Sequence, residues 1–221
     1  MTTEVTGTTP VGEEPLRRRR RRQTEQDICE AALTLFEEHG VAGCTADDIA
    51  RAAGVSSRTF FRYAVTKERA ALVVTGDIED AFEQGVAALR PDEPLLPQLE
   101  ALWVEVLRRH ENGRSPSGRQ LRRVYRLLRT EPSLRAAAVA VDDERRAGFA
   151  CALAELTGAA PDDPTPHILV ETTTAVVRVA MDRWAEQLEA APGGPGGPEP
   201  DLVALYEQAV AAFRAVTIPV A

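Results

Sequence analysis

The chain has 221 residues, 44% of them hydrophobic and 27% charged, a balance typical of a globular protein with a sizeable core. No run of about 18 uncharged apolar residues is present, which excludes a membrane-spanning helix, and residues 1–22 lack the apolar segment of a secretory signal, so we expect a cytoplasmic protein. The formal net charge of −8 argues, by itself, against a nucleic-acid partner.

The charge is distributed unevenly along the chain. Residues 17–70 hold 11 arginine or lysine residues against 8 acidic ones, whereas residues 71–221 hold 15 basic residues against 23 acidic ones. Such asymmetry is typical of a nucleic-acid-binding module joined to an acidic body.

Residues 1–22 form a predicted disordered basic arm. Its first part is rich in Thr, Gly, Pro and Glu, and six consecutive arginines follow from Arg17 to Arg22. The arginine run is interpreted either as a solvated tail or as an arm that lies along phosphates or enters a minor groove.

Residues 23–68 have the pattern of three helices. Apolar residues recur at helical spacing in the first helix, which ends near Gly40. Thr45 and Asp48 have the spacing of a capping box at the start of a short second helix, which ends at Gly54. Two short helices joined by a tight glycine turn indicate a helix-turn-helix.

The third helix, capped by Ser56, begins with hydroxyl and guanidinium groups. In a helix-turn-helix this helix lies in the major groove, with its N-terminal residues at base edges. Hydroxyl groups bind phosphates or bases, and Arg58 matches guanine O6 and N7. Phe60 is expected in the core, with Phe61 and Tyr63 outward; the alternative is a small helical subdomain with surface aromatics. The candidate DNA-binding residues are Thr45, Ser56, Ser57, Arg58, Thr59, Phe61, Arg62, Tyr63 and Lys67.

The rest of the chain predicts helices separated by Gly/Pro-rich breakers, with no alternating strand pattern. We predict an all-α fold, with an N-terminal three-helix helix-turn-helix DNA-binding domain and a larger C-terminal helical bundle. The expected helices of the bundle span about 67–90, 95–112, 117–130, 133–157, 164–190 and 201–216.

Residues 23–68 resemble the DNA-binding domain of the TetR family of bacterial repressors. The stretch AALTLFEEHGVAGCTADDIARAAGVSSRTFFRYAVTKE carries the family pattern. It departs from that pattern at Ala64 and Val65, where the family often has Phe and then a small residue or proline. The resemblance implies that Arg58 occupies a variable base-reading position. It implies contacts to DNA, mostly to the backbone, for Thr45, Ser57, Thr59, Phe61, Tyr63 and Lys67.

The resemblance also implies that residues 69–221 bind an effector and dimerise. The last two helices of each subunit would pair in a four-helix bundle, and the two-fold protein would read a palindromic operator. The apolar mix of the candidate residues suits a small, hydrophobic effector, which would release this repressor by favouring a conformation with wrongly spaced recognition helices. Each candidate effector-binding residue is alternatively an ordinary core residue; the candidates are Trp103, Leu107, Tyr125, Leu128, Phe149, Leu153, Thr173, Val177 and Met181.

The sequence indicates no enzyme and no metal site. It has no GxSxG, P-loop, GxGxxG or HExxH motif, and His39, His110 and His167 lie far apart with no Cys/His cluster of zinc spacing. We therefore expect no catalysis, no cofactor and no metal. The competing interpretation is a helical adaptor that binds a protein through residues 57–63, and salt dependence separates it from DNA binding.

The three cysteines are Cys29, Cys44 and Cys151. Their odd number and the lack of a CxxC pair favour reduced thiols over a disulfide framework. Cys29 and Cys44 are interpreted either as small core residues or as a redox switch.

Overall fold

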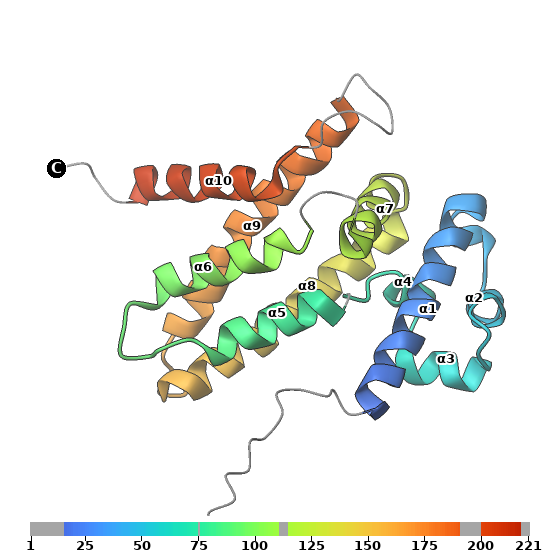
Figure 1. Cartoon of the computed structure of the whole chain (residues 1–221), viewed down its shortest axis with the longest axis horizontal. Coiled ribbons are helices and arrows are strands. Elements are labelled where there is room, and N and C mark those ends of the chain that lie inside the picture. The colour runs from blue at the N-terminus through green and yellow to red at the C-terminus, as the bar shows by residue number, and fades with distance from the viewer. Residues whose placement is uncertain (1–15, 75, 111–114, 191–199, 218–221) are drawn as a thin grey trace, which may run out of the picture.

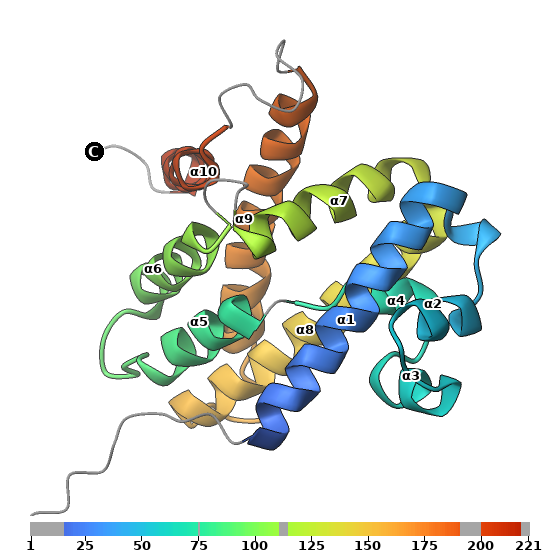
Figure 2. The ribbon, with the colours of Figure 1, turned by 45° about the vertical axis from the view of Figure 1, so that its right-hand side comes forward.

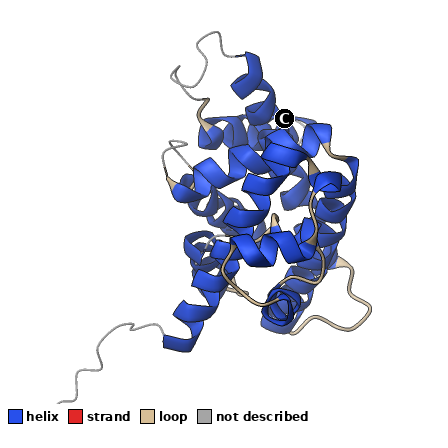
Figure 3. Ribbon diagram, turned by 90° about the vertical axis from the view of Figure 1, so that its right-hand side faces the viewer, coloured by secondary structure: helices blue, strands red, loops and turns tan. Residues whose placement is uncertain are grey.

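The structure is a computed structural model that describes residues 16–74, 76–110, 115–190 and 200–217. Every regular element in these ranges is helical, which confirms the predicted all-α fold (Figure 3). A 3-10 turn, Val41–Gly43, follows the first helix. The α-helices are α1 (Leu16–His39), α2 (Ala46–Ala52), α3 (Ser57–Tyr63), α4 (Lys67–Ala70), α5 (Gly76–Ala87), α6 (Leu95–Arg108), α7 (Pro116–Thr130), α8 (Pro132–Thr157), α9 (Thr165–Ala190) and α10 (Leu202–Thr217).

The N-terminal helices α1–α4, which we call the head, pack around one apolar core. Phe36 of α1, Ile49 of α2 and Phe60 of α3 are each at most 1% exposed and belong to the same cluster. Helices α2 and α3 lie on the side of α1 that faces away from α5 and α6 (Figure 1). Because helices of α3's length are not stable alone, packing on this core must hold α3 in place.

Both short helices of the head begin where the sequence predicts. The Thr45 hydroxyl accepts the N–H of Asp48, and the Asp48 carboxylate accepts the N–H of Thr45, which completes the capping box. The Ser56 hydroxyl accepts the N–H of Thr59 at 3.1 Å and caps α3. Gly54 has φ 69°, a conformation that favours glycine, and forms the turn between them. The expected helix-turn-helix is therefore present.

The arginine run is helical. Helix α1 begins at Leu16, so the expected disorder of residues 1–22 is wrong for residues 16–22, whereas residues 1–15 lie outside the described ranges. Arginine has a high intrinsic helix propensity, and the run continues directly into the amphipathic part of α1.

Ion pairs hold the N-terminal end of α1 against α5. The Arg22 guanidinium donates two hydrogen bonds to the Asp80 carboxylate, at 2.7 and 2.8 Å. Arg18 donates to Glu83 at 2.6 Å. The two parallel bonds between Arg22 and Asp80 fix the relative orientation of the two side chains as well as their distance. The pairs therefore give part of the arginine run a structural role between the head and the body.

The helix expected over residues 67–90 is two helices, α4 and α5. The chain leaves helical geometry after Ala70 and resumes it at Gly76. Val73 and Val74 lie in the break, where β-branched residues followed by a glycine weaken helix propensity. The break places a short connection between the head and the bundle.

Helices α5–α10, which we call the body, form the larger bundle. Helix α9 packs against α8 and α10, and α6 contacts α5, α9 and α10 (Figure 2). Trp103 of α6 packs against three neighbouring apolar clusters and so lies at their junction. None of the helices in the described part of the chain has the length and apolar character needed to cross a membrane.

Cys29 and Cys44 are both buried in the head core as free thiols. Burial raises the pKa of the Cys29 thiol to about 12 and also raises the pKa of Cys44. A thiol that stays protonated is a poor nucleophile. The structure therefore favours the packing interpretation over a redox switch.

Replacing Asp80 with Asn should destabilise the protein at neutral pH. The hydrogen bond from Arg22 lowers the pKa of Asp80 below its ordinary value. Its folded-state carboxylate therefore stabilises the protein above the ordinary pKa of 3.8, and this contribution is lost as the pH falls through the lowered value. We expect a loss of about 1 kcal/mol for D80N at pH 7, allowing for solvent screening of this partly exposed pair.

Urea unfolding of D80N and the unsubstituted protein over a descending pH series measures this difference. D92N, at an exposed turn between α5 and α6, removes the same charge and should change stability little. A deficit of D80N that stays constant as the pH drops below 3.8 would contradict the assignment to the Arg22–Asp80 pair.

Candidate nucleic-acid interface

Helix α3 presents a polar and aromatic face to solvent because its opposite face is anchored. Phe60 is 0% exposed, whereas Phe61 is 55% exposed, and their rings meet edge to face at 5.3 Å between centroids. Ser57, Arg58 and Arg62 are exposed beside Phe61. The outward placement expected for Phe61 and the core placement expected for Phe60 are both confirmed.

Tyr63 lies at the edge of this face and is only partly outward. Its ring packs against the head core, and its hydroxyl accepts a hydrogen bond from Arg62 at 3.4 Å. The Arg62 guanidinium also lies over the ring, 4.9 Å from its centroid. The two side chains therefore form one unit that presents a cation and a hydroxyl together at the end of α3.

Thr45 and Thr59 are largely occupied by capping. The Thr45 hydroxyl donates to the Asp48 carboxylate at 2.6 Å, and the Thr59 hydroxyl lies 2.9 Å from the Ser56 hydroxyl. The hydrogen bonds from Thr45 and then from Arg51 lower the pKa of Asp48 to about 2. Direct contacts from Thr45 and Thr59 to DNA stay predictions, since their hydroxyl groups already have partners in this structure.

Lys67 has an internal role that the sequence did not indicate. Its ammonium donates to the carbonyl oxygens of Val41 at 2.7 Å and Cys44 at 2.9 Å. These bonds tie the start of α4 to the corner between α1 and α2. The expected contact of Lys67 with the DNA backbone stays a prediction, and holding this corner is its visible function.

Asp47 belongs to the same surface and was not among the sequence candidates. The Ser57 hydroxyl donates to the Asp47 carboxylate at 2.5 Å, which joins the first turn of α2 to the first turn of α3. The signal in the sequence was Asp47 itself, the first of two consecutive aspartates, because the capping box needs only Asp48.

The candidate effector residues do not share one cavity. Phe149 and Leu153 lie in one body cluster, and Leu107, Val177 and Met181 lie in another. Trp103 packs against both clusters, Tyr125 stacks edge to face on Trp184 of the second cluster, and Thr173 is buried on α9.

Leu128 is separate from this group, which corrects the sequence-based set. It packs against the head core from α7, together with Val124, and so helps to join the head to the body. The amphipathic pattern of α7 could not show which of two cores its apolar face meets.

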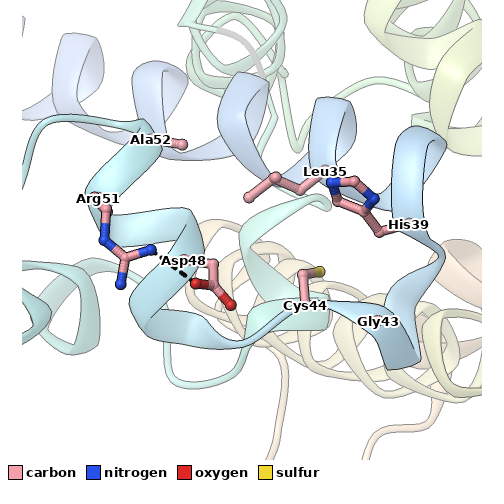
Figure 4. Close-up of a pocket in the computed structure, with 7 residues that line it drawn as sticks. All are labelled: Leu35, His39, Gly43, Cys44, Asp48, Arg51 and Ala52. Carbon is pink, nitrogen blue, oxygen red and sulfur yellow. Dashed lines mark hydrogen bonds and ion pairs between the residues drawn. The ribbon is translucent and has the colours of Figure 1, made fainter.

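Two hollows among the described residues also lie apart from most of these candidates. A surface hollow with a cavity volume of about 480 Å³ lies on the head. Figure 4 shows the ion pair of Asp48 with Arg51 on one side of this hollow and His39 near Leu35 on the other. A gap of only about 10 Å³ in the body has Thr173 in its lining, with Tyr206 and Phe213. Neither hollow is a formed site for an apolar effector in the body.

Comparison with known sequences places the chain in a family. A profile described as "Bacterial regulatory proteins, tetR family" matches residues 28–69, and one described as "MftR C-terminal domain" matches residues 96–194. The HTH-type transcriptional regulator TcmR of Streptomyces glaucescens is 31% identical over 185 residues, which cover 82% of this chain and 81% of that protein. The chain belongs to the TetR family of transcriptional regulators.

The chain is also similar to a second regulator of known sequence and to two solved structures. The putative mycofactocin biosynthesis transcriptional regulator MftR of Mycobacterium tuberculosis is 30% identical over 166 residues, covering 75% of this chain and 82% of that protein. A solved TetR-family regulator from Mesorhizobium loti matches with a TM-score of 0.45 and 19% identity, covering 89% of this chain and 98% of the other. Thermus thermophilus FadR, solved with lauroyl-CoA, gives a TM-score of 0.44 and 21% identity over 89% of this chain and 96% of that one.

Replacing Lys67 with Met distinguishes its two candidate roles. If Lys67 holds the corner between α1 and α2, K67M leaves two carbonyl groups without their donor and should destabilise the protein by about 1–3 kcal/mol. DNA affinity should then fall while its salt dependence stays unchanged. Thermal unfolding and a binding titration over a salt series measure both quantities.

Arg62→Gln is the matched control, because Arg62 is exposed on α3 and its loss should lower the salt slope by about 1 without a comparable loss of stability. A K67M protein that behaves like R62Q, stable but with a reduced salt slope, would assign Lys67 to a phosphate.

Proposed function

We propose that this regulator binds a palindromic DNA operator as a homodimer, represses transcription there, and is released by a small, hydrophobic effector. The observation that carries the proposal is the face of α3. Phe60 anchors the helix from beneath, and Ser57, Arg58, Phe61 and Arg62 stand exposed in consecutive turns above it. This is the arrangement in which a recognition helix enters the major groove and meets base edges and phosphates.

The helical arginine run supports the same proposal. Arg21, near the N-terminal end of α1, lies close enough to Tyr63 of α3 to interact with it electrostatically, so the exposed side of this helix end can extend the basic surface toward the DNA backbone. Arg19 and Arg20 are exposed, whereas Arg18 and Arg22 contact α5. The arginine run therefore contributes to DNA binding as a helix end along phosphates, in place of a disordered arm.

An aromatic cluster in the body supports an apolar effector. The Phe82 ring lies 5.7 Å from Trp103 and 4.8 Å from Phe149, measured between centroids. The indole Nε1 of Trp103 is buried and has no hydrogen-bond partner among the described residues. An effector with an apolar body and one acceptor atom would satisfy this donor. Ligand sites usually measure about 300–1,000 Å³, so binding requires these rings to separate.

An exposed apolar face on the last two helices supports the dimer. Ile168, Ala175 and Val179 lie on one side of α9 with spacings of seven and four residues. Ile168 is 59% exposed and Val179 is 48% exposed, which is unusual for large apolar residues at such spacing. Val216 of α10 is also exposed. Pairing these helices with their copies gives a four-helix bundle and two recognition helices related by two-fold symmetry.

Fluorescence anisotropy of the purified protein tests the DNA-binding function directly. The probe is duplex DNA from just upstream of its own gene, with a random duplex alongside, over a salt series. We expect tight binding to the upstream duplex with dimer stoichiometry, a clear preference over the random duplex and a steep salt slope. Apolar compounds that release the DNA in the same assay identify the effector class.

The outcomes separate the candidate functions. If the protein binds neither duplex at low salt, the DNA-binding function is wrong, and the alternative that α3 binds a protein partner is favoured. Weak and equal binding to both duplexes would place the operator elsewhere, and selection from random DNA would then find it.

Substituting Val179 with Asp should disrupt the dimer. A charge on this α9 face is costly to bury between two copies. We expect V179D to sediment as a monomer and to lose at least tenfold in operator affinity, because a monomer contacts one half-site. V139D changes a similarly exposed valine on α8 and should stay dimeric. A dimeric V179D protein with unchanged affinity would exclude this face.

A further inference from the structure

Two consecutive aspartates open α2, and the capping box uses only one of them. Asp48 completes the capping box with Thr45 and pairs with Arg51. Asp47 takes part in neither interaction, and no ion pair among the described residues contains it. Its carboxylate instead accepts a hydrogen bond from the Ser57 hydroxyl at 2.5 Å. Asp47 is therefore an exposed anion at the base-reading end of α3.

A carboxylate in this place opposes DNA binding unless it contacts a base. Phosphates repel it, and its loss of hydration on binding is costly without a donor in return. Stabilisation of the α2 dipole is one benefit, but Asp48 already supplies a carboxylate to the same turn. A hydrogen-bond donor on a base would offset the cost of placing the Asp47 carboxylate at the DNA surface.

The bond between Ser57 and Asp47 fixes which donor fits. The hydroxyl gives its only proton to Asp47, so the pair presents only acceptor oxygens. In the major groove, the edges of guanine and thymine carry hydrogen-bond acceptors, which do not pair with the acceptor oxygens of Asp47 and Ser57. Adenine carries an acceptor next to its amino group. Cytosine offers the N4 amino group with no neighbouring acceptor, and carboxylates are its usual protein partners.

We propose that Asp47, oriented by Ser57, is a specificity-determining residue that selects cytosine at one position of each operator half-site. Arg58, the next residue on α3, supplies donors for a guanine at a neighbouring position. The interface then reads a cytosine and a guanine with side chains of opposite charge. This inference rests on the proposed DNA-binding function and adds a base preference to it.

Selection from a library of randomised DNA duplexes tests the proposal without a known operator. The unsubstituted protein should enrich a two-fold motif in which one half-site position is cytosine. In D47A that position should lose its preference by about tenfold, while the other positions stay unchanged. In D47N it should shift toward adenine, because an amide pairs with adenine N6 and N7. R58A should weaken the base preference at a different position of the motif. D92A, which removes a distant exposed charge, should weaken the base preference at no position.

The controls separate failure of this inference from failure of the proposed function. Thermal unfolding of D47A and D47N checks that any change in selectivity occurs in a folded head. A D47A motif identical to the original, with higher affinity for every duplex, would overturn the inference and leave Asp47 as a repelling charge. If the unsubstituted protein enriches no motif, the proposed function fails first and the inference fails with it.

Discussion

The burial of Phe60 is the constraint on which the proposed DNA-binding surface of α3 depends. A helix of seven residues has no stability of its own, so the rotation of α3 about its axis is set by the one side chain that the head core encloses. The Ser56 cap fixes where the helix starts, and Phe60 fixes which way it faces. Together they direct Ser57, Arg58, Phe61 and Arg62 outward, which no local property of those residues would achieve.

Polar contacts then join the head to the body across several helices. Arg22 holds Asp80 of α5, and Arg123 of α7 donates to Glu30 and Glu37 of α1 at 2.5 and 3.1 Å. Arg69 of α4 pairs with Glu144 of α8. Individually, partly exposed ion pairs contribute little to stability. Together, however, these bonds restrain orientation. They join α1 and α4 of the head to three helices of the body and so limit how the head can rotate relative to the body.

Local signals in the sequence were sufficient for the helix-turn-helix. Capping by Thr45 and Ser56 and the positive φ of Gly54 depend on neighbours within a few residues. The same reasoning failed where the partner lies far along the chain. The partner of Arg22 is 58 residues away, and an arginine run looks alike whether it is solvated or paired.

Longer-range packing also decides the roles of residues in the middle of the chain. Leu128 has the spacing of a body residue but packs on the head, and the ammonium of Lys67 turns inward to two carbonyls 23 and 26 residues away. A helix period shows that one face is apolar without showing which core it meets. For the effector residues, the sequence gives a set of apolar positions, and only tertiary packing divides them between clusters.

Helix α5 links the two proposed sites through its opposite faces. Asp80 and Phe82 are two residues apart, so one points toward α1 and the other into the aromatic cluster with Trp103 and Phe149. The proposed effector would displace Phe82 by separating these rings, and a short rigid helix would carry Asp80 with it. Arg22 must then follow α5 or lose its carboxylate, and either response changes how α1 supports the recognition helix. In the proposed function, release from DNA would thus need no contact between effector and head, only an unequal affinity of the effector for two positions of α5.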